Sequence, residues 1–127
     1  MAVAPETLIE RKQLYIGGAW VDPSSDATID VVNASTEEVM GRIPEGTAQD
    51  VDKAVRAAHQ AFLEWRRWKP RDRGALLKKV AAALRAHAEE LALLDAANCG
   101  NPVKAMIRDG YDGPDYIDFF AGLATEA

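Results

Sequence analysis

Residues 47–65, TAQDVDKAVRAAHQAFLEW, carry the pattern from which the rest of this chain can be interpreted. Thr47 and Asp50 are spaced as a capping box, in which the hydroxyl and the carboxylate each bind a backbone N–H at a helix N-terminus. Apolar side chains then recur at helical spacing: Val51, Ala54, Val55, Ala58, Phe62 and Trp65. The pattern predicts a long amphipathic helix whose apolar stripe packs against a core.

The residues before this helix favour short strands. Gly17-Gly18 supplies the positive φ angles that a tight hairpin needs. Four segments are β-prone and are separated by turn signals: 14–16, 19–21, 28–32 and 39–43. The sequence therefore predicts a small antiparallel β unit over residues 14–46, after a disordered or polar arm at residues 1–13.

The residues after residue 65 favour further helices. Pro70 can begin a second long helix, because the first turn leaves the N–H that proline lacks unbonded, and Gly100 can end it. The predicted apolar stripe of this helix is Leu77, Val80, Leu84, His87, Leu91 and Leu94. Two shorter helices follow, one from Pro102 to Asp109 and one that begins at Pro114.

The last predicted helix carries an apolar stripe of Phe119, Phe120 and Leu123, and no Gly, Asn or Pro follows it before Ala127. The layout belongs to the α/β class, with a small antiparallel β unit followed by two long and two short helices over residues 47–127. So few strands cannot cover such long stripes. We therefore expect the complete core to include residues outside this chain.

The composition excludes several classes of protein. Hydrophobic residues make up 48% and charged residues 28%, which is ordinary for a soluble globular domain. No apolar run is long enough to span a membrane, and the N-terminus lacks the basic and apolar regions of a secretion signal. One cysteine, Cys99, excludes an intrachain disulfide. We expect a cytoplasmic protein with no membrane partner.

The net charge of −5 is unevenly distributed. Residues 1–46 contain three basic and eight acidic residues, whereas residues 66–79 contain seven basic residues and one acidic residue, Asp72. With Trp65 and Trp68 beside it, the basic run invites a nucleic-acid-binding interpretation. The negative total charge and the lack of a recognised nucleic-acid motif favour a solvated connector, or a surface that pairs with acids elsewhere in a larger protein. We expect no nucleic-acid partner.

Signatures of catalytic and ligand sites are missing from the sequence, which has no G-x-G-x-x-G, phosphate loop, HExxH or CxxC. Cys99 falls at a predicted helix C-terminus, where the dipole disfavours a thiolate, so we expect an inert, buried or half-buried thiol. His87 is expected as a packed core or edge histidine, and His59 as a solvated one. A solvated acidic face is expected at Asp109, Asp112, Asp115 and Asp118.

Six segments in order resemble motifs of the aldehyde dehydrogenase superfamily, with natural spacing over the chain from Leu14. They are 14–21 (LYIGGAWV), 32–39 (VNASTEEV), 50–62 (DVDKAVRAAHQAF), 73–77 (RGALL), 100–102 (GNP) and 119–122 (FFAG). Each motif alone is weak, but the ordered series is specific. The similarity implies that residues 14–127 are the N-terminal segment of an NAD(P)-dependent aldehyde dehydrogenase.

In that family a cysteine thiolate attacks the aldehyde, a hydride passes to NAD or NADP, and a glutamate-activated water hydrolyses the thioester. The family's motifs for these steps lie beyond the equivalent of Ala127, and Cys99 matches none of them. The resemblance thus implies no catalytic and no cofactor-binding residue in this segment, so the segment alone should be inactive. It also implies that the full-length enzyme is a homo-oligomer. The alternative is a non-enzymatic, truncated interaction or subunit-like module of the same family.

The chain departs from the family pattern at single positions. Ala34 stands where Pro is usual, Glu37 where Gly is usual, and Asn101 where Lys is usual. In some members an acid and two backbone carbonyls hold a structural monovalent cation, and the matching residues here are Val31, Val32 and Asn98. Because Asn98 is neutral, we expect no metal site.

Overall fold

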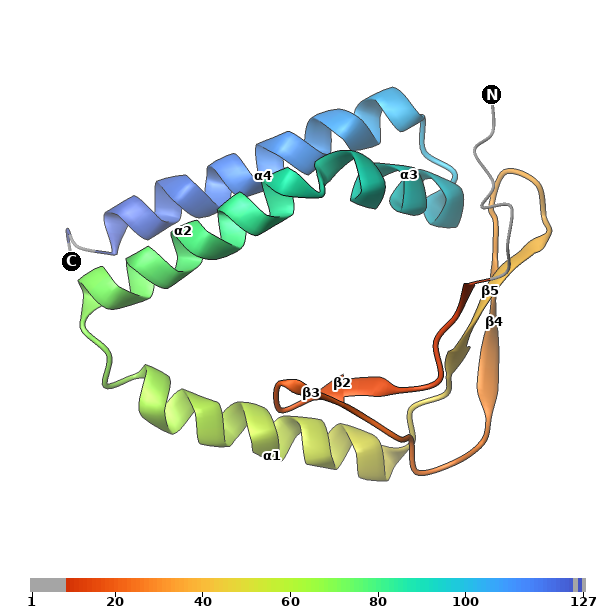
Figure 1. The fold of residues 1–127 in the computed structure, drawn as a ribbon, viewed down its shortest axis with the longest axis horizontal. Helices are drawn as coiled ribbons and strands as arrows, with labels where there is room; N and C mark the ends of the chain where they lie inside the picture. Colours follow the sequence, from red (N-terminus) through yellow and green to blue (C-terminus); the bar gives the residue numbers. More distant parts are fainter. Residues whose placement is uncertain (1–8, 125, 127) are drawn as a thin grey trace. The chain divides into compact units, whose positions relative to one another are not determined.

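The computed structural model describes residues 9–124 and 126 (Figure 1). The chain divides after Arg66 into two compact units. The first unit contains the strands and helix α1, and the second contains helices α2, α3 and α4. Each unit is described by itself.

The first unit is built on a three-stranded sheet with the order β1-β5-β4. Strand β5 (Val39–Pro44) pairs antiparallel with β4 (Thr28–Val32), and both strands were predicted. Strand β1 (Ile9–Glu10) pairs parallel with β5 and was not predicted, because a strand of two residues shows no alternation. Residues 1–8 of the predicted polar arm lie outside the described residues.

A β-hairpin forms where Gly17-Gly18 predicts one. Strands β2 (Leu14–Ile16) and β3 (Ala19–Val21) pair antiparallel, and the two glycines have φ angles of 63° and 86°. The rings of Tyr15 and Trp20 meet edge to face across the hairpin, with centroids 5.2 Å apart. The sequence prediction is confirmed here.

The turn between β4 and β5 is closed by Asn33, which is buried. Its N–H donates to the carbonyl of Glu38, and its carbonyl accepts from the N–H of Glu37, both at 2.8 Å. Its side chain also accepts from the N–H of Ser35 at 2.9 Å. Glu37 closes the loop with a φ of 61°, a left-handed conformation that is costly for a residue with a β-carbon.

Helix α1 (Ala48–Trp65) begins with the predicted capping box of Thr47 and Asp50. The hairpin lies beside it (Figure 1), where Gly17 approaches Ala57. The predicted stripe is only partly covered, since Val51, Val55 and Phe62 remain 58%, 61% and 51% exposed.

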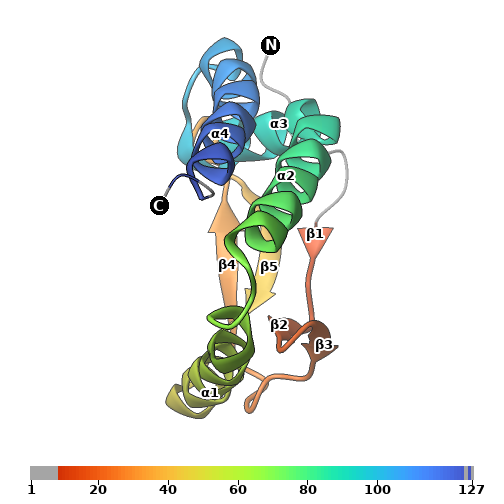
Figure 2. The same cartoon turned by 90° about the vertical axis from the view of Figure 1, so that its left-hand side faces the viewer.

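The second unit is a layer of three helices, α2 (Pro70–Ala86), α3 (Ala88–Cys99) and α4 (Val103–Leu123). Figures 1 and 2 show α4 lying along α2, and its N-terminal part also packs on α3. The described residues thus contain four helices, the number expected, but only α1 corresponds to one predicted helix. The predicted helix over residues 70–99 is broken at His87, whose φ and ψ of −113° and 15° are not helical.

The core of this unit consists largely of small side chains. Its buried apolar residues are Ala81, Ala88, Ala92, Ala96, Ala97, Met106 and Ala121. Within the described residues, the predicted leucine-rich stripe is only partly covered: Leu77 and Leu84 are half-buried, whereas Leu91 and Leu94 are 44% and 46% exposed. Alanine and glycine allow the helix backbones to approach closely. Ala88, directly after the bend at His87, lies against Gly110 of α4 in this way.

Helix α4 continues through Gly110 and Pro114, where the sequence predicts two shorter helices. A β-carbon on Gly110 would stand 3.0 Å from the carbonyl oxygen of Ala88, so this glycine serves close packing and does not end the helix. Pro114 is buried within α4, where packing outweighs the loss of one helical hydrogen bond. The prediction that one helix ends at Asp109 and another begins at Pro114 is therefore wrong.

Candidate functional site

Asp50 is a buried carboxylate at the N-terminus of α1, with only 3% of its surface exposed. Its Oδ2 accepts hydrogen bonds from the N–H and the hydroxyl of Thr47, at 3.0 and 2.8 Å. Its Oδ1 accepts from the hydroxyl of Ser24 at 2.6 Å and from the N–H of Ser24 at 3.1 Å. The side chain joins the start of α1 to the loop before β4. The sequence predicts the cap but gives no signal for the bond to Ser24, 26 positions away.

These hydrogen bonds, with that from the Ser24 hydroxyl contributing most, hold the pKa of Asp50 well below its usual range, while desolvation acts in the opposite direction. Lys53 Nζ lies 3.4 Å from Oδ1 of Asp50 and donates to Ser24 Oγ at 2.8 Å. A carboxylate that stays ionised and whose oxygens are occupied is a poor general base. The arrangement is therefore suited to positioning, and not to proton transfer.

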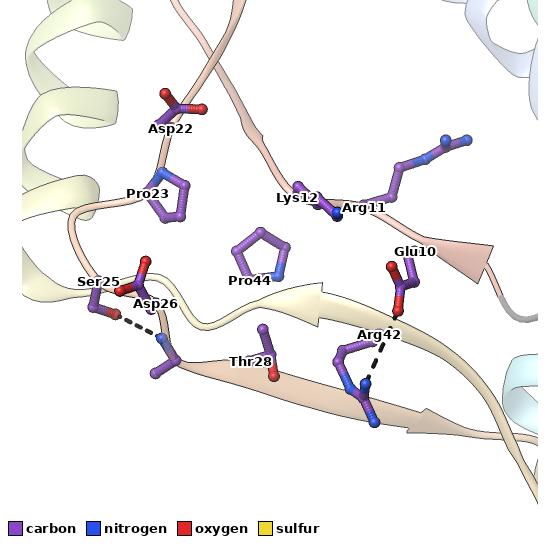
Figure 3. A pocket seen from close by; sticks show the side chains of 11 residues that line it. Glu10, Arg11, Lys12, Asp22, Pro23, Ser25, Asp26, Thr28, Arg42 and Pro44 are labelled. Carbon is purple, nitrogen blue, oxygen red and sulfur yellow. Dashed lines mark hydrogen bonds and ion pairs between the residues drawn. The ribbon is translucent and has the colours of Figure 1, made fainter.

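A pocket of about 490 Å³ opens on the surface of the first unit, between the loop that precedes β4 and the strands β1 and β5 (Figure 3). Side chains of both charges line it: Glu10, Arg11, Lys12, Asp22, Asp26 and Arg42. None of its lining residues is a cysteine or a histidine. The pocket thus offers no thiol that could act as a nucleophile.

Neighbouring groups already bind several of the charges in this pocket. Arg42 Nε donates to Asp30 Oδ1 at 2.7 Å, and the Arg42 guanidinium lies 4.0 Å from Glu10. The bond to Asp30 raises the pKa of Arg42 above its usual value. Asp22 accepts a hydrogen bond from Gln13 at 2.9 Å. Part of the charge on the pocket's walls is therefore already bound by neighbouring side chains.

The three residues that match the family's cation ligands lie in different units. Val31 and Val32 are on β4, at a bulge where the register against β5 shifts. Asn98 is exposed near the C-terminus of α3. The expectation about a cation at these residues stays a prediction. Across residues 9–124 and 126, no group of three or more His, Cys, Asp and Glu side chains is arranged to hold a metal ion.

The cysteine and the histidines are exposed. Cys99 is the last residue of α3, as predicted, but the expectation of a buried or half-buried thiol is wrong, because it lies beyond the cluster of Ala92, Ala96 and Met106. His87 is not a packed histidine either: it lies at the break between α2 and α3, with Nδ1 3.0 Å from Glu90 Oε2. His59 is exposed, as expected.

The acidic row on α4 is exposed to differing degrees and is paired with arginines. Arg85 of α2 donates to Asp115 at 2.8 Å and to Asp118 at 2.9 Å, and the bond to Asp115 is the main cause of a raised pKa of Arg85. Arg108 lies 3.9 Å from both Asp109 and Asp112. Asp115 and Asp118 therefore link α4 to α2, whereas Asp109 and Asp112 are exposed and pair within α4.

Large apolar side chains remain exposed on the outer face of α4. Tyr116, Phe119 and Phe120 are 61–66% exposed, and the two phenylalanine rings pack edge to face at 5.3 Å. In the first unit, Val51, Val55 and Phe62 of α1 are uncovered as well. Such faces are typical of surfaces that pack against further protein. Within the described residues, no helix is long and apolar enough to cross a membrane.

Comparison with known proteins agrees with this description. The model of the aldehyde dehydrogenase family matches residues 20–127. The chain is 42% identical over 118 residues to aldehyde dehydrogenase tropH of Talaromyces stipitatus. This match covers 93% of the chain and 23% of that protein. It superimposes on lactaldehyde dehydrogenase from Escherichia coli with a TM-score of 0.88 and 35% identity, over 95% of the chain and 25% of that structure.

A third similarity includes a bound cofactor. The chain is 30% identical to betaine aldehyde dehydrogenase from Staphylococcus aureus in complex with NAD+, with a TM-score of 0.83, over 89% of the chain and 23% of that structure. This chain spans about a quarter of the length of the relatives that it matches. The strands and helices described above correspond to the N-terminal part of their fold.

Proposed function

Because this chain belongs to the aldehyde dehydrogenase family, we propose that it serves as the N-terminal segment of an enzyme that oxidises an aldehyde to a carboxylic acid with NAD or NADP. The observation that carries this proposal is the match of residues 20–127 to the family model, together with the coverage of only a quarter of each relative. The substrate is proposed only as an aldehyde.

The contacts within the segment support a scaffolding role. Asp50 and Ser24 fix the start of α1, while Arg85, Asp115 and Asp118 join α2 to α4. The exposed faces of α1 and α4 would then be the surfaces that carry the rest of the enzyme. We propose that the segment contributes architecture and no catalytic residue.

The N-termini of α1 and α2 do not offer the usual binding site for the pyrophosphate of a nicotinamide dinucleotide. A pyrophosphate is bound by free N–H groups at a helix N-terminus, usually after a glycine-rich turn. Thr47 and Asp50 already cap α1, and α2 begins at Pro70, which has no N–H. We therefore assign no cofactor-binding residue and derive no step through the cofactor. NAD or NADP belongs to this proposal only through the family, one of whose members is seen with NAD+.

Three further expectations belong to the same proposal. The complete enzyme is proposed to be a homo-oligomer, to be cytoplasmic, and to have no nucleic-acid partner. They rest on the family resemblance, the single cysteine and the total charge of −5.

The purified 127-residue chain gives a direct test of the inactivity that we propose. With NAD or NADP and a panel of small aldehydes, we expect no reduced cofactor by absorbance and no cofactor binding by calorimetry. A complete aldehyde dehydrogenase of the family serves as the positive control. Aldehyde-dependent formation of NADH or NADPH by the chain alone would overturn the proposal.

A non-enzymatic module of the same family is the second candidate, and the exposed aromatic face of α4 favours it. Such a module would bind a partner protein through Tyr116, Phe119 and Phe120 and would take part in no oxidation. A stably folded monomer that does not change when these residues are made polar would argue against this candidate.

A further inference from the structure

We propose that Arg73 of α2 anchors the part of the enzyme that lies outside this chain. Its guanidinium binds the carboxylate of an Asp or Glu side chain that this other part contributes. The inference rests on the proposed function, because it takes this chain as the N-terminal segment of a longer protein. It gives Arg73 a positioning role and no part in the oxidation itself.

Arg73 carries a buried hydrogen-bond donor that the described part of the chain leaves without an acceptor. The residue is half-buried, and its Nε atom is buried with no hydrogen-bond partner among residues 9–124 and 126. By contrast, Arg42, Arg85 and Arg108 each lie within 4.0 Å of two carboxylates. A buried N–H that loses water and gains no acceptor costs free energy, and a guanidinium does not avoid this cost by releasing its proton.

The segment that contains Arg73 lies beside the end of α4. Figures 1 and 2 show the start of α2 next to that end. Arg73 directly precedes Gly74, where an added β-carbon would stand 2.7 Å from the carbonyl oxygen of Ala121 and 4.0 Å from the β-carbon of Ala124. In the proposed enzyme the chain continues from this end of α4, so residues outside the described part can reach Arg73.

The charge around Arg73 favours an acid as the acceptor. Residues 66–79 contain seven basic residues and one acid, Asp72, which is exposed and next to Arg73 in the sequence. Adjacent residues on a helix do not face each other. The four aspartates of α4 each lie within 4.0 Å of a different arginine, Arg85 or Arg108. A carboxylate from elsewhere would accept from the Nε–H and would also balance the charge, which a backbone carbonyl would not do.

The sign of the effect of one substitution tests the proposal. Arg73→Met keeps most of the apolar stem and removes the guanidinium. In the 127-residue chain it removes a buried donor that has no acceptor, so the midpoint of thermal unfolding should rise by about 3 °C or more. In the complete enzyme it leaves the partner carboxylate unpaired, so the midpoint should fall by about 3 °C or more. A side chain that only fills space would lower both midpoints.

Two comparisons isolate the charge. Arg71→Met is the matched control at an exposed arginine of the same helix, and it should shift either midpoint by less than about 2 °C. Arg73→Glu and Arg73→Gln differ mainly in charge. In the complete enzyme the Glu variant should unfold at a lower temperature than the Gln variant, because two carboxylates then meet. In the 127-residue chain it should not, because the other basic residues of this segment attract a carboxylate.

Far-ultraviolet circular dichroism checks that each variant retains its helices. A lower or unchanged midpoint for Arg73→Met in the 127-residue chain would overturn the inference, as would a raised or unchanged midpoint in the complete enzyme. Equal midpoints of the Glu and Gln variants in the complete enzyme would overturn the carboxylate as the partner. The activity of the unaltered complete enzyme tests the proposed function separately. If that enzyme oxidises no aldehyde but Arg73→Met still shifts the two midpoints in opposite directions, the proposed function fails and the anchor stands.

Discussion

Gly74 at the start of α2 touches Ala121 near the end of α4 so closely that a β-carbon on Gly74 would stand 2.7 Å from the carbonyl oxygen of Ala121. These residues belong to two segments that resemble family motifs, 73–77 and 119–122, and the fold brings these segments together. The contact gives a physical reason for a glycine in a helix interior, where it otherwise costs stability.

Gly74→Ala should therefore destabilise the chain. The added methyl group meets backbone, which cannot move as a flexible side chain does, so we expect a loss of about 1–3 kcal/mol in the free energy of unfolding. Gly122→Ala is the matched control, since a β-carbon there meets nothing within 4 Å and alanine should stabilise the helix by about 0.5–1 kcal/mol. Urea denaturation measures both. Equal effects of the two substitutions would contradict the proposed contact.

Glu37→Gly should stabilise the chain. Glu37 has a φ of 61°, and a left-handed conformation costs an ordinary residue about 1–2 kcal/mol, part of which glycine loses again through its freer unfolded state. Thermal unfolding should show a higher midpoint for this variant. Glu38→Gly is the control, at a neighbouring residue without a positive φ, and is expected to lower the midpoint of thermal unfolding. A lower midpoint for Glu37→Gly would exclude strain at this turn.

Asp50 should make the stability depend on pH in the acid range. Its pKa is lowered in the folded chain from an ordinary value of 3.8, mainly by the hydrogen bond from Ser24. Its contribution is therefore complete above about pH 5 and is lost as the pH falls below the unfolded pKa. Asp50→Asn should lower stability at neutral pH and flatten this acid dependence, measured by urea denaturation between pH 2 and 6. Asp52→Asn, at an exposed carboxylate on the same helix, should have a smaller effect. A pH profile of Asp50→Asn that runs parallel to that of the unaltered chain would contradict the assignment.

Phe119→Ser and Phe120→Ser should leave the stability of the chain nearly unchanged. Both rings are more than 60% exposed, and substitutions at such positions usually change the free energy of unfolding by less than about 0.5 kcal/mol. The same changes should reduce the binding of a hydrophobic fluorescent dye, because they remove exposed apolar surface. Met106→Ser, in the core between α3 and α4, should destabilise strongly. A large loss of stability for Phe120→Ser would show that its ring is covered in solution.

The features that sequence could predict are those with local signals. The capping box of Thr47 and Asp50 lies within one helical turn, and Gly17-Gly18 determines its hairpin through its own φ angles. Both signals are set by residues next to one another, so no knowledge of distant contacts was needed. The ordered family motifs then identified the fold to which these elements belong.

The features that were missed depend on contacts between distant residues. Ser24 binds Asp50 across 26 positions, and the two-residue strand β1 exists only through pairing with β5. The break at His87 and the uninterrupted α4 accompany a close contact of Ala88 with Gly110, which helical periodicity alone does not reveal. The predicted apolar stripes do not show which residues are buried within this chain: the described core uses mostly alanines, and several stripe leucines and phenylalanines are exposed. In the proposed function, the larger residues remain for surfaces beyond this quarter of the enzyme.

The most direct test of the account is a chimera in which this chain replaces the matching quarter of lactaldehyde dehydrogenase from Escherichia coli, to which it is 35% identical with a TM-score of 0.88. The measurement is the lactaldehyde-dependent formation of NADH or NADPH, with the same enzyme lacking that quarter as the control. If the chain is an architectural segment without catalytic residues, the chimera should form reduced cofactor and the truncated control should form none. A chimera that is insoluble, or that is soluble and inactive beside an active parent enzyme, would contradict the account.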